Sequence, residues 1–168
     1  MWALNVFCSF FFMCESGNAF VVCCFTCALL PTPLHTTVHH CTTLHTTAGG
    51  HVYAIGGQSG KRCVASCEWL DPQSGVGWLL ATGQLHTVRK YASAAVLSGR
   101  IHVVGGLNMQ RTRLSDMEAY DPREGIWHCL PGMQQPRSSS GLASLGGKLY
   151  AGRELREGDF MRVDMVIY

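Results

Sequence analysis

The chain has 168 residues, with 13 lysines and arginines against 11 acidic residues and a formal net charge of +2. This near-balance excludes the strongly basic surface by which nucleic acids or anionic membranes are usually bound. Apolar residues make up 47% of the chain and charged residues 14%, a composition that excludes an intrinsically disordered protein. The nine cysteines are too few for a dense disulfide scaffold of this length.

The composition changes abruptly near Gly49. Residues 1–48 hold a single formal charge, Glu15, whereas residues 49–168 hold all 13 basic residues and nearly all the glycines. Such a break predicts two regions of different structure or origin. We therefore expect residues 1–48 to be an apolar, then threonine- and histidine-rich segment that is poorly structured or serves in targeting, and residues 49–168 to be the folded domain.

The first 30 residues contain two apolar runs, 2–14 and 19–30. Each run is shorter than the roughly 18–20 residues that span a bilayer as a helix, so we expect no membrane contact. The first run has the length of a secretory signal peptide, but no lysine or arginine precedes it, as such a signal requires. A signal peptide and a membrane anchor stay open as alternatives.

Threonine and histidine dominate the rest of this segment. Cys24 and Cys27, followed by His35 and His39, have the ligand spacing of half a zinc finger. The gap between the two pairs is too short for the hairpin and helix of a finger, so we expect no metal. Alternating His and Thr codons also arise from a CA-dinucleotide repeat, and residues 1–48 are alternatively a mis-joined exon.

The second region repeats itself with a period just under 50 residues. The distance from Gly50 to Gly99 is 49 positions, and the distance from Gly99 to Gly147 is 48. Each of these glycines opens a run of β-branched and aromatic residues, which is typical of a short strand. In the first two units the run ends in a glycine pair, at 56–57 and 105–106.

Other signals recur in the same register. An Asp-Pro pair predicts a turn, because proline presets its φ and the aspartate side chain can accept from the backbone ahead. A tryptophan follows it and starts a further strand, and an arginine stands between units. These residues are Asp71, Trp78 and Arg89, which recur as Asp121, Trp127 and Arg137. Each unit therefore predicts four short strands.

This set of motifs resembles the kelch repeat, and specifically the repeats of kelch-like proteins. The resemblance covers residues 49–168. It implies an all-β fold, a partial kelch β-propeller of about two and a half four-stranded antiparallel blades, preceded by a non-kelch apolar segment. The blade units would span about 49–85, 86–134 and 135–168, the last one incomplete.

Two departures from the pattern stand out. Upstream of Gly49, His40 takes the place of the arginine and the threonine-rich residues 42–47 take the place of an apolar strand, so we expect the first blade to lack a normal opening strand. In the third unit, residues 152–154 stand where the glycine pair belongs. Propellers close with about four to eight blades. We therefore expect the chain to be a fragment that needs the remaining blades, from a parent chain or by oligomerisation.

The resemblance implies two sets of site residues. The structural set comprises Gly56, Gly57, Asp71, Trp78, Arg89, Gly105, Gly106, Tyr120, Asp121, Trp127 and Arg137. The ligand-binding set lies in loops after the glycine pairs and just past the inter-blade arginines, and comprises Gln58, Ser59, Lys61, Arg62, Tyr91, Asn108, Gln110, Arg111, Arg113 and Ser139. Its basic members favour an acidic peptide through charge-assisted hydrogen bonds.

By this resemblance the chain is a protein–protein interaction module, similar to the substrate-recognition part of adaptors of cullin-type ubiquitin ligases. We expect a cytoplasmic protein with free thiols, and neither a cofactor, a metal nor a nucleic-acid partner. The sequence contains no nucleophile elbow or phosphate-binding loop, so we expect no enzyme. Three alternatives remain: a secreted or membrane-attached propeller fragment, an actin-binding kelch protein, and a truncated product without independent function.

Overall fold

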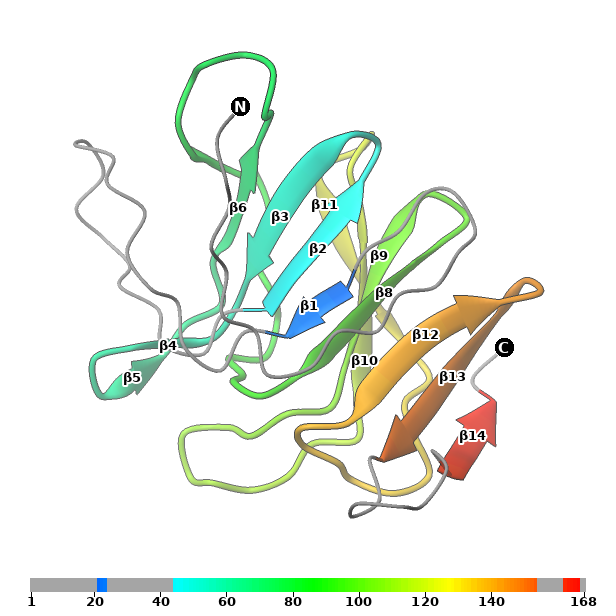
Figure 1. Cartoon of the computed structure of the whole chain (residues 1–168). Helices are drawn as coiled ribbons and strands as arrows, with labels where there is room; N and C mark the ends of the chain where they lie inside the picture. Colours follow the sequence, from blue (N-terminus) through cyan, green and yellow to red (C-terminus); the bar gives the residue numbers. More distant parts are fainter. Residues whose placement is uncertain (1–20, 24–43, 154–161, 167–168) are drawn as a thin grey trace.

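A computed structural model describes residues 21–23, 44–153 and 162–166. Regular structure within these residues is entirely β, in 14 strands (Figure 1). The expected all-β class is confirmed. The signal-peptide, membrane-anchor and zinc-finger interpretations concern residues that lie outside the described part or whose side chains are not described there.

Twelve of the strands form three antiparallel sheets, which we call blades 1 to 3. Blade 1 has the order β1 (Val21–Cys23), β2 (Leu44–Ala48), β3 (His51–Ile55), β6 (Cys67–Leu70) and β7 (Leu79–Leu80). Blade 2 has the order β8 (Ser93–Leu97), β9 (Arg100–Val104), β10 (Met117–Asp121) and β11 (Ile126–Leu130). Blade 3 has the order β12 (Gly141–Leu145), β13 (Lys148–Arg153) and β14 (Arg162–Val166). A small hairpin, β4 (Gln58–Ser59) and β5 (Arg62–Cys63), projects from blade 1.

The three blades stand face to face, with β2, β8 and β12 near one another. Strand β8 contacts both β2 and β12, so the blades radiate from the side on which these strands lie, and β1 lies on the inner edge of β2 (Figure 1). Each following strand of a blade lies further out, as the strand order within the sheets requires. This arrangement is that of a partial β-propeller, as expected.

Blade 2 is buried on both faces, which explains why its strands lack an alternation of polar and apolar residues. Successive side chains of a strand point to opposite faces of the sheet. On β9, Ile101 and Val103 join the apolar cluster shared with blade 1, whereas Val104 joins the cluster shared with blade 3. Each cluster fills the space between two neighbouring blades, so the hydrophobic core consists of the blade interfaces.

The first blade does have an opening strand, and the expectation that it lacks one was wrong. Strand β2 pairs with β3 along its full length, from Leu44 opposite Ile55 to Ala48 opposite His51. Threonine is β-branched and suits a half-buried strand, and Thr46 is only 1% exposed. The sheet thus begins before the compositional break at Gly49. Strand β1 pairs in turn with the other edge of β2.

The glycine pairs are required where two blades meet. Gly105 has a φ of +66°, in the left-handed region, and a Cβ there would stand 2.5 Å from the carbonyl oxygen of Arg137. The N–H of Gly106 donates to that same carbonyl at 2.8 Å, and Gly57 makes the equivalent bond to Arg89 at 2.8 Å. Each glycine pair therefore fastens its blade to the segment that leads to the next blade.

Blade 3 shows what happens where the pair is replaced. Strand β13 runs on to Arg153, past the point where β3 and β9 end. An arginine favours extended backbone over the left-handed conformation of glycine. The pairing of β13 with β14 shifts register between Ala151 and Gly152, which marks a β-bulge. Strand β14 takes the place of the third strand of a blade.

Close approach at Gly83 gives a test of the interface between blades 1 and 2. A Cβ at Gly83 would lie 2.8 Å from the carbonyl oxygen of Gly125 and 3.0 Å from Cδ1 of Trp127. We expect Gly83→Ala to lower the free energy of unfolding in urea by about 1–3 kcal/mol, because two backbones must separate. Gly77→Ala is the matched control, since a Cβ there meets nothing within 4 Å. Equal effects of the two substitutions would contradict this packing.

Burial of His102 predicts a pH dependence of stability. The side chain is 7% exposed, and its loss of hydration lowers the pKa of the imidazole below the ordinary value of 6.5. As the pH falls through 6.5, the unfolded chain therefore binds a proton before the folded chain does. The free energy of unfolding should fall between pH 7.5 and 5.5, by at most about 1.4 kcal/mol per pH unit from this group. His102→Leu should reduce that fall, and an unchanged fall in the variant would contradict the assignment.

Candidate functional site

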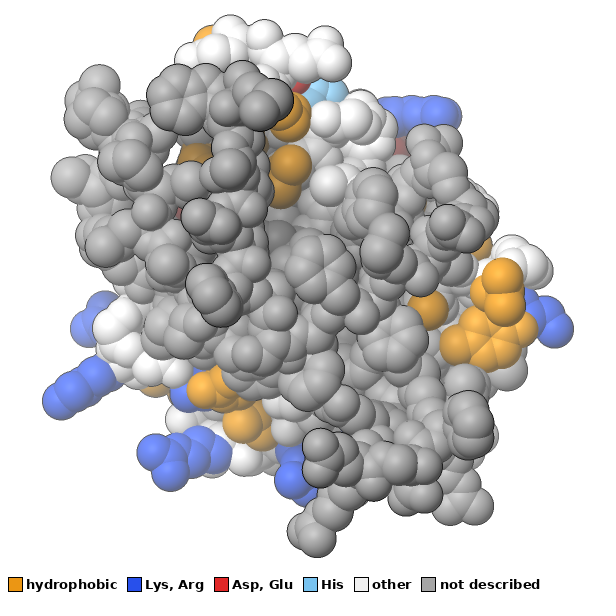
Figure 2. All heavy atoms as spheres, in the orientation of Figure 1, with side chains coloured by type: hydrophobic (Ala, Val, Ile, Leu, Met, Phe, Trp, Pro, Cys, Tyr) orange, Lys and Arg blue, Asp and Glu red, His pale blue; other side chains and the backbone are white. Residues whose placement is uncertain are grey.

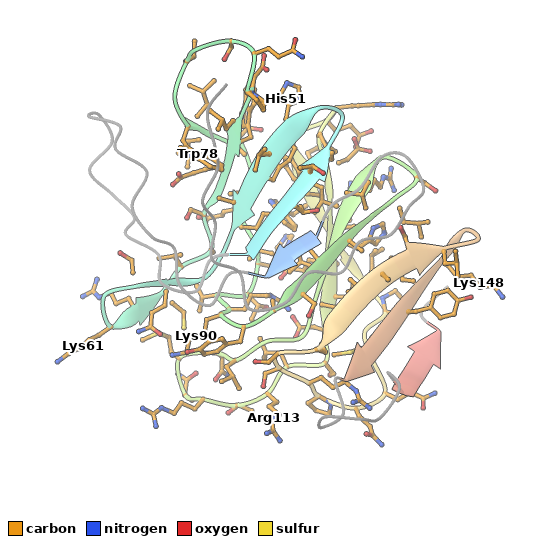
Figure 3. The ribbon with its side chains drawn as sticks, viewed as in Figure 1. His51, Lys61, Trp78, Lys90, Arg113 and Lys148 are labelled. Carbon is orange, nitrogen blue, oxygen red and sulfur yellow. The ribbon has the colours of Figure 1, made fainter. Side chains whose placement is uncertain are left out.

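The loops after the glycine pairs gather at one end of the blades. We call segments 58–63, 90–91, 107–113 and 137–139 the loop surface. Figure 3 shows Lys61, Lys90 and Arg113 at this end, whereas His51 and Lys148 lie at the other. All ten residues of the predicted ligand-binding set belong to the loop surface, so the structure brings them together. Their contact with a ligand stays a prediction.

Backbone hydrogen bonds join these loops across the blades. Lys90 and Leu107 bond to each other in both directions, at 3.0 and 2.7 Å. The N–H of Ser139 donates to the carbonyl of Tyr91 at 2.9 Å, which links the two positions just past the inter-blade arginines. The loops therefore form one connected surface on a rigid scaffold, the arrangement that binding sites commonly use.

Three residues of the loop surface adopt the left-handed backbone conformation. The φ angles are 55° at Tyr91, 53° at Ser139 and 60° at Arg111. This conformation is costly for residues other than glycine and concentrates at functional sites. At Arg111 it closes a tight loop in which Asn108 accepts at its side-chain oxygen from the N–H of Thr112, at 2.9 Å. Asn108 thus shapes the loop that presents Arg111.

The members of the predicted set differ in how far they reach into solvent. Six are exposed, namely Lys61, Arg62, Gln110, Arg111, Arg113 and Ser139. Four are half-buried, namely Gln58, Ser59, Tyr91 and Asn108.

The loop surface is basic. Its segments contain six lysines and arginines and no acidic residue, the basic ones being Lys61, Arg62, Lys90, Arg111, Arg113 and Arg137. Blue side chains project at the lower edge of the molecule in Figure 2, below β4 and β5. The carboxylate of nearby Asp116 forms an ion pair with the guanidinium of Arg89, which partly neutralises its negative charge. The surface therefore presents positive charge to a partner.

Lys90 is a member of this surface that the repeat motif does not indicate. Its ammonium donates to Oε1 of Gln58 at 2.6 Å and lies 5.4 Å from the ring centroid of Tyr91. It therefore joins the β4–β5 hairpin of blade 1 to the segment entering blade 2. The signal that could have found it was its place directly after Arg89, in the part of the repeat that leads onto the loop surface.

Met109 is the second residue that sequence reasoning missed. Its side chain is 45% exposed, and its Sδ accepts a hydrogen bond of 2.9 Å from the backbone N–H of Cys63. The contact joins a loop of blade 2 to the hairpin of blade 1. Because it spans 46 positions of sequence, no local pattern indicates it.

Arg89 lies inside the blade boundary and is only 1% exposed. Its guanidinium donates to Oε1 of Glu118 at 2.6 Å, to the carbonyl of Gly105 at 2.9 Å and to the carboxylate of Asp116. The other oxygen of Glu118 accepts from the backbone N–H and the ring Nδ1 of His86, at 2.7 and 2.9 Å. Arg89 therefore stabilises the boundary between blades 1 and 2 and is not exposed to a partner.

Arg137 occupies the equivalent position but has different side-chain contacts. Its Nη2 donates to Oε1 of Gln135 at 3.4 Å, while its carbonyl accepts from Gly106. In the third unit the repeat places Val166 where blade 2 has Glu118. The sequence thus supplies no carboxylate at that position.

The Asp-Pro turns bond as their sequence predicts. Oδ1 of Asp71 accepts from the N–H of Gln73 at 2.8 Å, and Oδ1 of Asp121 accepts from Arg123 at 3.0 Å. The second bond, together with the one from Arg100, lowers the pKa of Asp121. Both turns lie at the end of the blades opposite the loop surface.

The two tryptophans are placed differently. Trp127 lies in β11, 5.1 Å from the ring of Tyr120, and is buried against blade 1. Trp78 is half-buried and precedes β7 instead of starting it, contrary to the expectation. Trp127 packs on Gly83 of the preceding unit. For Trp78, the repeat places the equivalent of Gly83 at residue 34, which lies outside the described part of the chain.

The described residues offer little other chemistry. Among them, no three His, Cys, Asp or Glu side chains form a group that could hold a metal ion, and no helix is long and apolar enough to cross a membrane. Cys63, Cys67 and Cys129 are free thiols. Burial raises the pKa of Cys67 to about 12, which keeps this thiol protonated at neutral pH.

Comparison with known proteins agrees with the repeat and the blades. The sequence profile of the Kelch motif matches residues 41–76 and 89–134. Human Kelch-like protein 28 is 32% identical over 106 residues, which cover 58% of this chain and 18% of that protein. Kelch-like ECH-associated protein 1B of Danio rerio is 34% identical over 103 residues, 60% of this chain and 17% of its own length.

A third relative, human Kelch repeat and BTB domain-containing protein 13, is 32% identical over 84 residues, 49% of this chain and 18% of the relative. The chain thus spans less than a fifth of the length of these curated relatives. The profile covers both repeated units, beginning before β2, and each unit forms an antiparallel blade. Residues 41–76 and 89–134 therefore form kelch repeats, and the chain is similar to kelch-like proteins.

Proposed function

We propose that the loop surface is where this protein–protein interaction module binds an acidic segment of a partner protein. The observation that carries the proposal is the charge of the loop surface, which has six basic residues and no acidic one. Charge-assisted hydrogen bonds from arginine to carboxylate are stronger and more directional than neutral ones. A partner segment rich in Asp or Glu would therefore be recognised here in preference to a basic or neutral one.

The geometry of the loops supports binding with little rearrangement. The mutual hydrogen bonds of Lys90 with Leu107, and the bond from Ser139 to Tyr91, hold the loops before any partner arrives. The tight loop at Asn108 presents Arg111 and Arg113 to solvent. Ordering a surface in advance reduces the entropy lost on association.

As part of the same proposal, the chain is the substrate-recognition part of an adaptor of a cullin-type ubiquitin ligase in the cytoplasm. Its support is the similarity to kelch-like proteins, one of which carries a BTB domain by its name. Free thiols among the described cysteines suit a reducing compartment. The proposed role is binding, and contact with the ligase would belong to other parts of the full protein.

Charge reversal at one end of the blades tests the proposal. The double variant Arg111→Glu with Arg113→Glu should bind a fluorescein-labelled hexaglutamate peptide at least about tenfold more weakly than the unaltered chain, since two attractive charges become repulsive. The control variant, Arg123→Glu with Lys148→Glu, reverses two exposed charges at the opposite end and should bind as before. Fluorescence anisotropy at low salt measures both affinities.

Salt supplies an independent readout. Binding of the peptide to the unaltered chain should weaken as sodium chloride is raised, because exposed charges are screened. Equal loss of affinity in the two double variants would contradict a site at the loop surface. Absence of any salt-sensitive binding would contradict an acidic partner.

A further inference from the structure

We infer that Met109 is an apolar anchor on the loop surface, and that the partner's acidic segment carries an apolar side chain that packs on it. This inference rests on the proposed function and specifies the chemistry of its partner. It concerns a residue that neither the repeat motif nor the charge of the surface indicates.

Met109 differs in its location from the other exposed apolar side chains of the described residues. Among the described residues, the large hydrophobic side chains with high exposure are Val76, Leu79, Leu80, Met109, Ile126 and Leu145. Leu79, Leu80 and Ile126 lie on the outermost strands, and Val76 and Leu145 lie in or beside turns at the opposite end. Met109 alone of these belongs to the loop surface.

The methionine is held at the junction of two blades. Its Sδ accepts from the backbone N–H of Cys63 at 2.9 Å. The loop that carries it is closed by Asn108, whose backbone N–H donates to the carbonyl of Thr112 at 3.1 Å. A side chain fixed in this way loses less freedom when a partner covers it than a freely rotating one would.

The surroundings of Met109 determine what can cover it. The exposed basic residues Lys61 and Arg62 lie in the hairpin that contains Cys63, and Arg111 follows in the same loop. An apolar centre within a charged rim is the usual composition of a protein-binding hot spot. The thioether is polarisable and adapts to different apolar shapes. The matching partner is therefore an acidic segment with one leucine-like side chain among its carboxylates.

Two peptides that differ in one residue test this inference. The probes are fluorescein-labelled Glu-Glu-Glu-Leu-Glu-Glu-Glu and the same peptide with glycine at its centre. We expect the full chain to bind the leucine peptide roughly fivefold more tightly, the effect of removing part of a leucine side chain from water. Met109→Ala should abolish this preference and keep the affinity for the glycine peptide. Met109→Leu should retain the preference.

The control and the outcomes separate the anchor from the basic surface. Leu80→Ala truncates a side chain that is 73% exposed on β7, and it should leave the preference unchanged. Equal binding of the two peptides by the unaltered chain would overturn the anchor while leaving the basic surface intact. Binding of neither peptide would overturn the proposed function and the anchor together. A preference that survives in Met109→Ala would place the apolar contact elsewhere and overturn the assignment to this residue.

Discussion

The buried carboxylate of Glu118 is the constraint on which the arrangement of the loops depends. A carboxylate removed from water is tolerated only when its lone pairs are satisfied. One segment satisfies them: the backbone amides of His86 and Thr87 and the guanidinium of Arg89 all donate to it. This segment leaves blade 1 and enters blade 2, so the path between the blades is determined by one charged group in β10.

The path between the blades in turn positions the loops. The carbonyl of Arg89 accepts from Gly57, which fixes the start of the β4–β5 hairpin. The next residue, Lys90, bonds to Leu107 and to Gln58, and Tyr91 accepts from Ser139. The loop surface is therefore assembled by hydrogen bonds that begin at the clamp between Glu118 and Arg89. The apolar clusters hold the blades together, whereas the clamp sets the position of the loops between them.

The repeat made much of this fold predictable from sequence. Glycine pairs, Asp-Pro turns and Trp127 each have a local physical reason, so their recurrence predicted the blades. Prediction from local sequence failed where contacts with other strands determine whether a segment forms a strand or a side chain is buried. The threonine-rich residues of β2 form a strand because they pair with the edge of β3 and because Thr46 is buried in the interior of the fold. Trp78 has the same sequence setting as Trp127 but is less buried.

The candidate site shows the same limit. Its loops were predicted from the resemblance, and basic residues within them were visible in the sequence. The roles of Lys90 and Met109 depend on contacts with Gln58 and Cys63, in a different repeat unit. Distances of this kind depend on how blades pack, which single-chain periodicity does not encode. The charge pattern of the sequence thus suggests the kind of partner, whereas the shape of the site can be determined only from the structure.

Amide hydrogen exchange on Glu118→Gln tests the clamp most directly. Hydrogen bonds to a charged group contribute about 1.5–3 kcal/mol, so their weakening should accelerate exchange at His86 and Thr87 roughly tenfold or more. If the clamp sets the position of the loops, the amides of Lys90 and Ser139 should also exchange faster, whereas the amide of Gly125 at the opposite end should not change. Unchanged exchange at Lys90 and Ser139, with faster exchange at His86 and Thr87, would show that the loops hold their positions without the clamp.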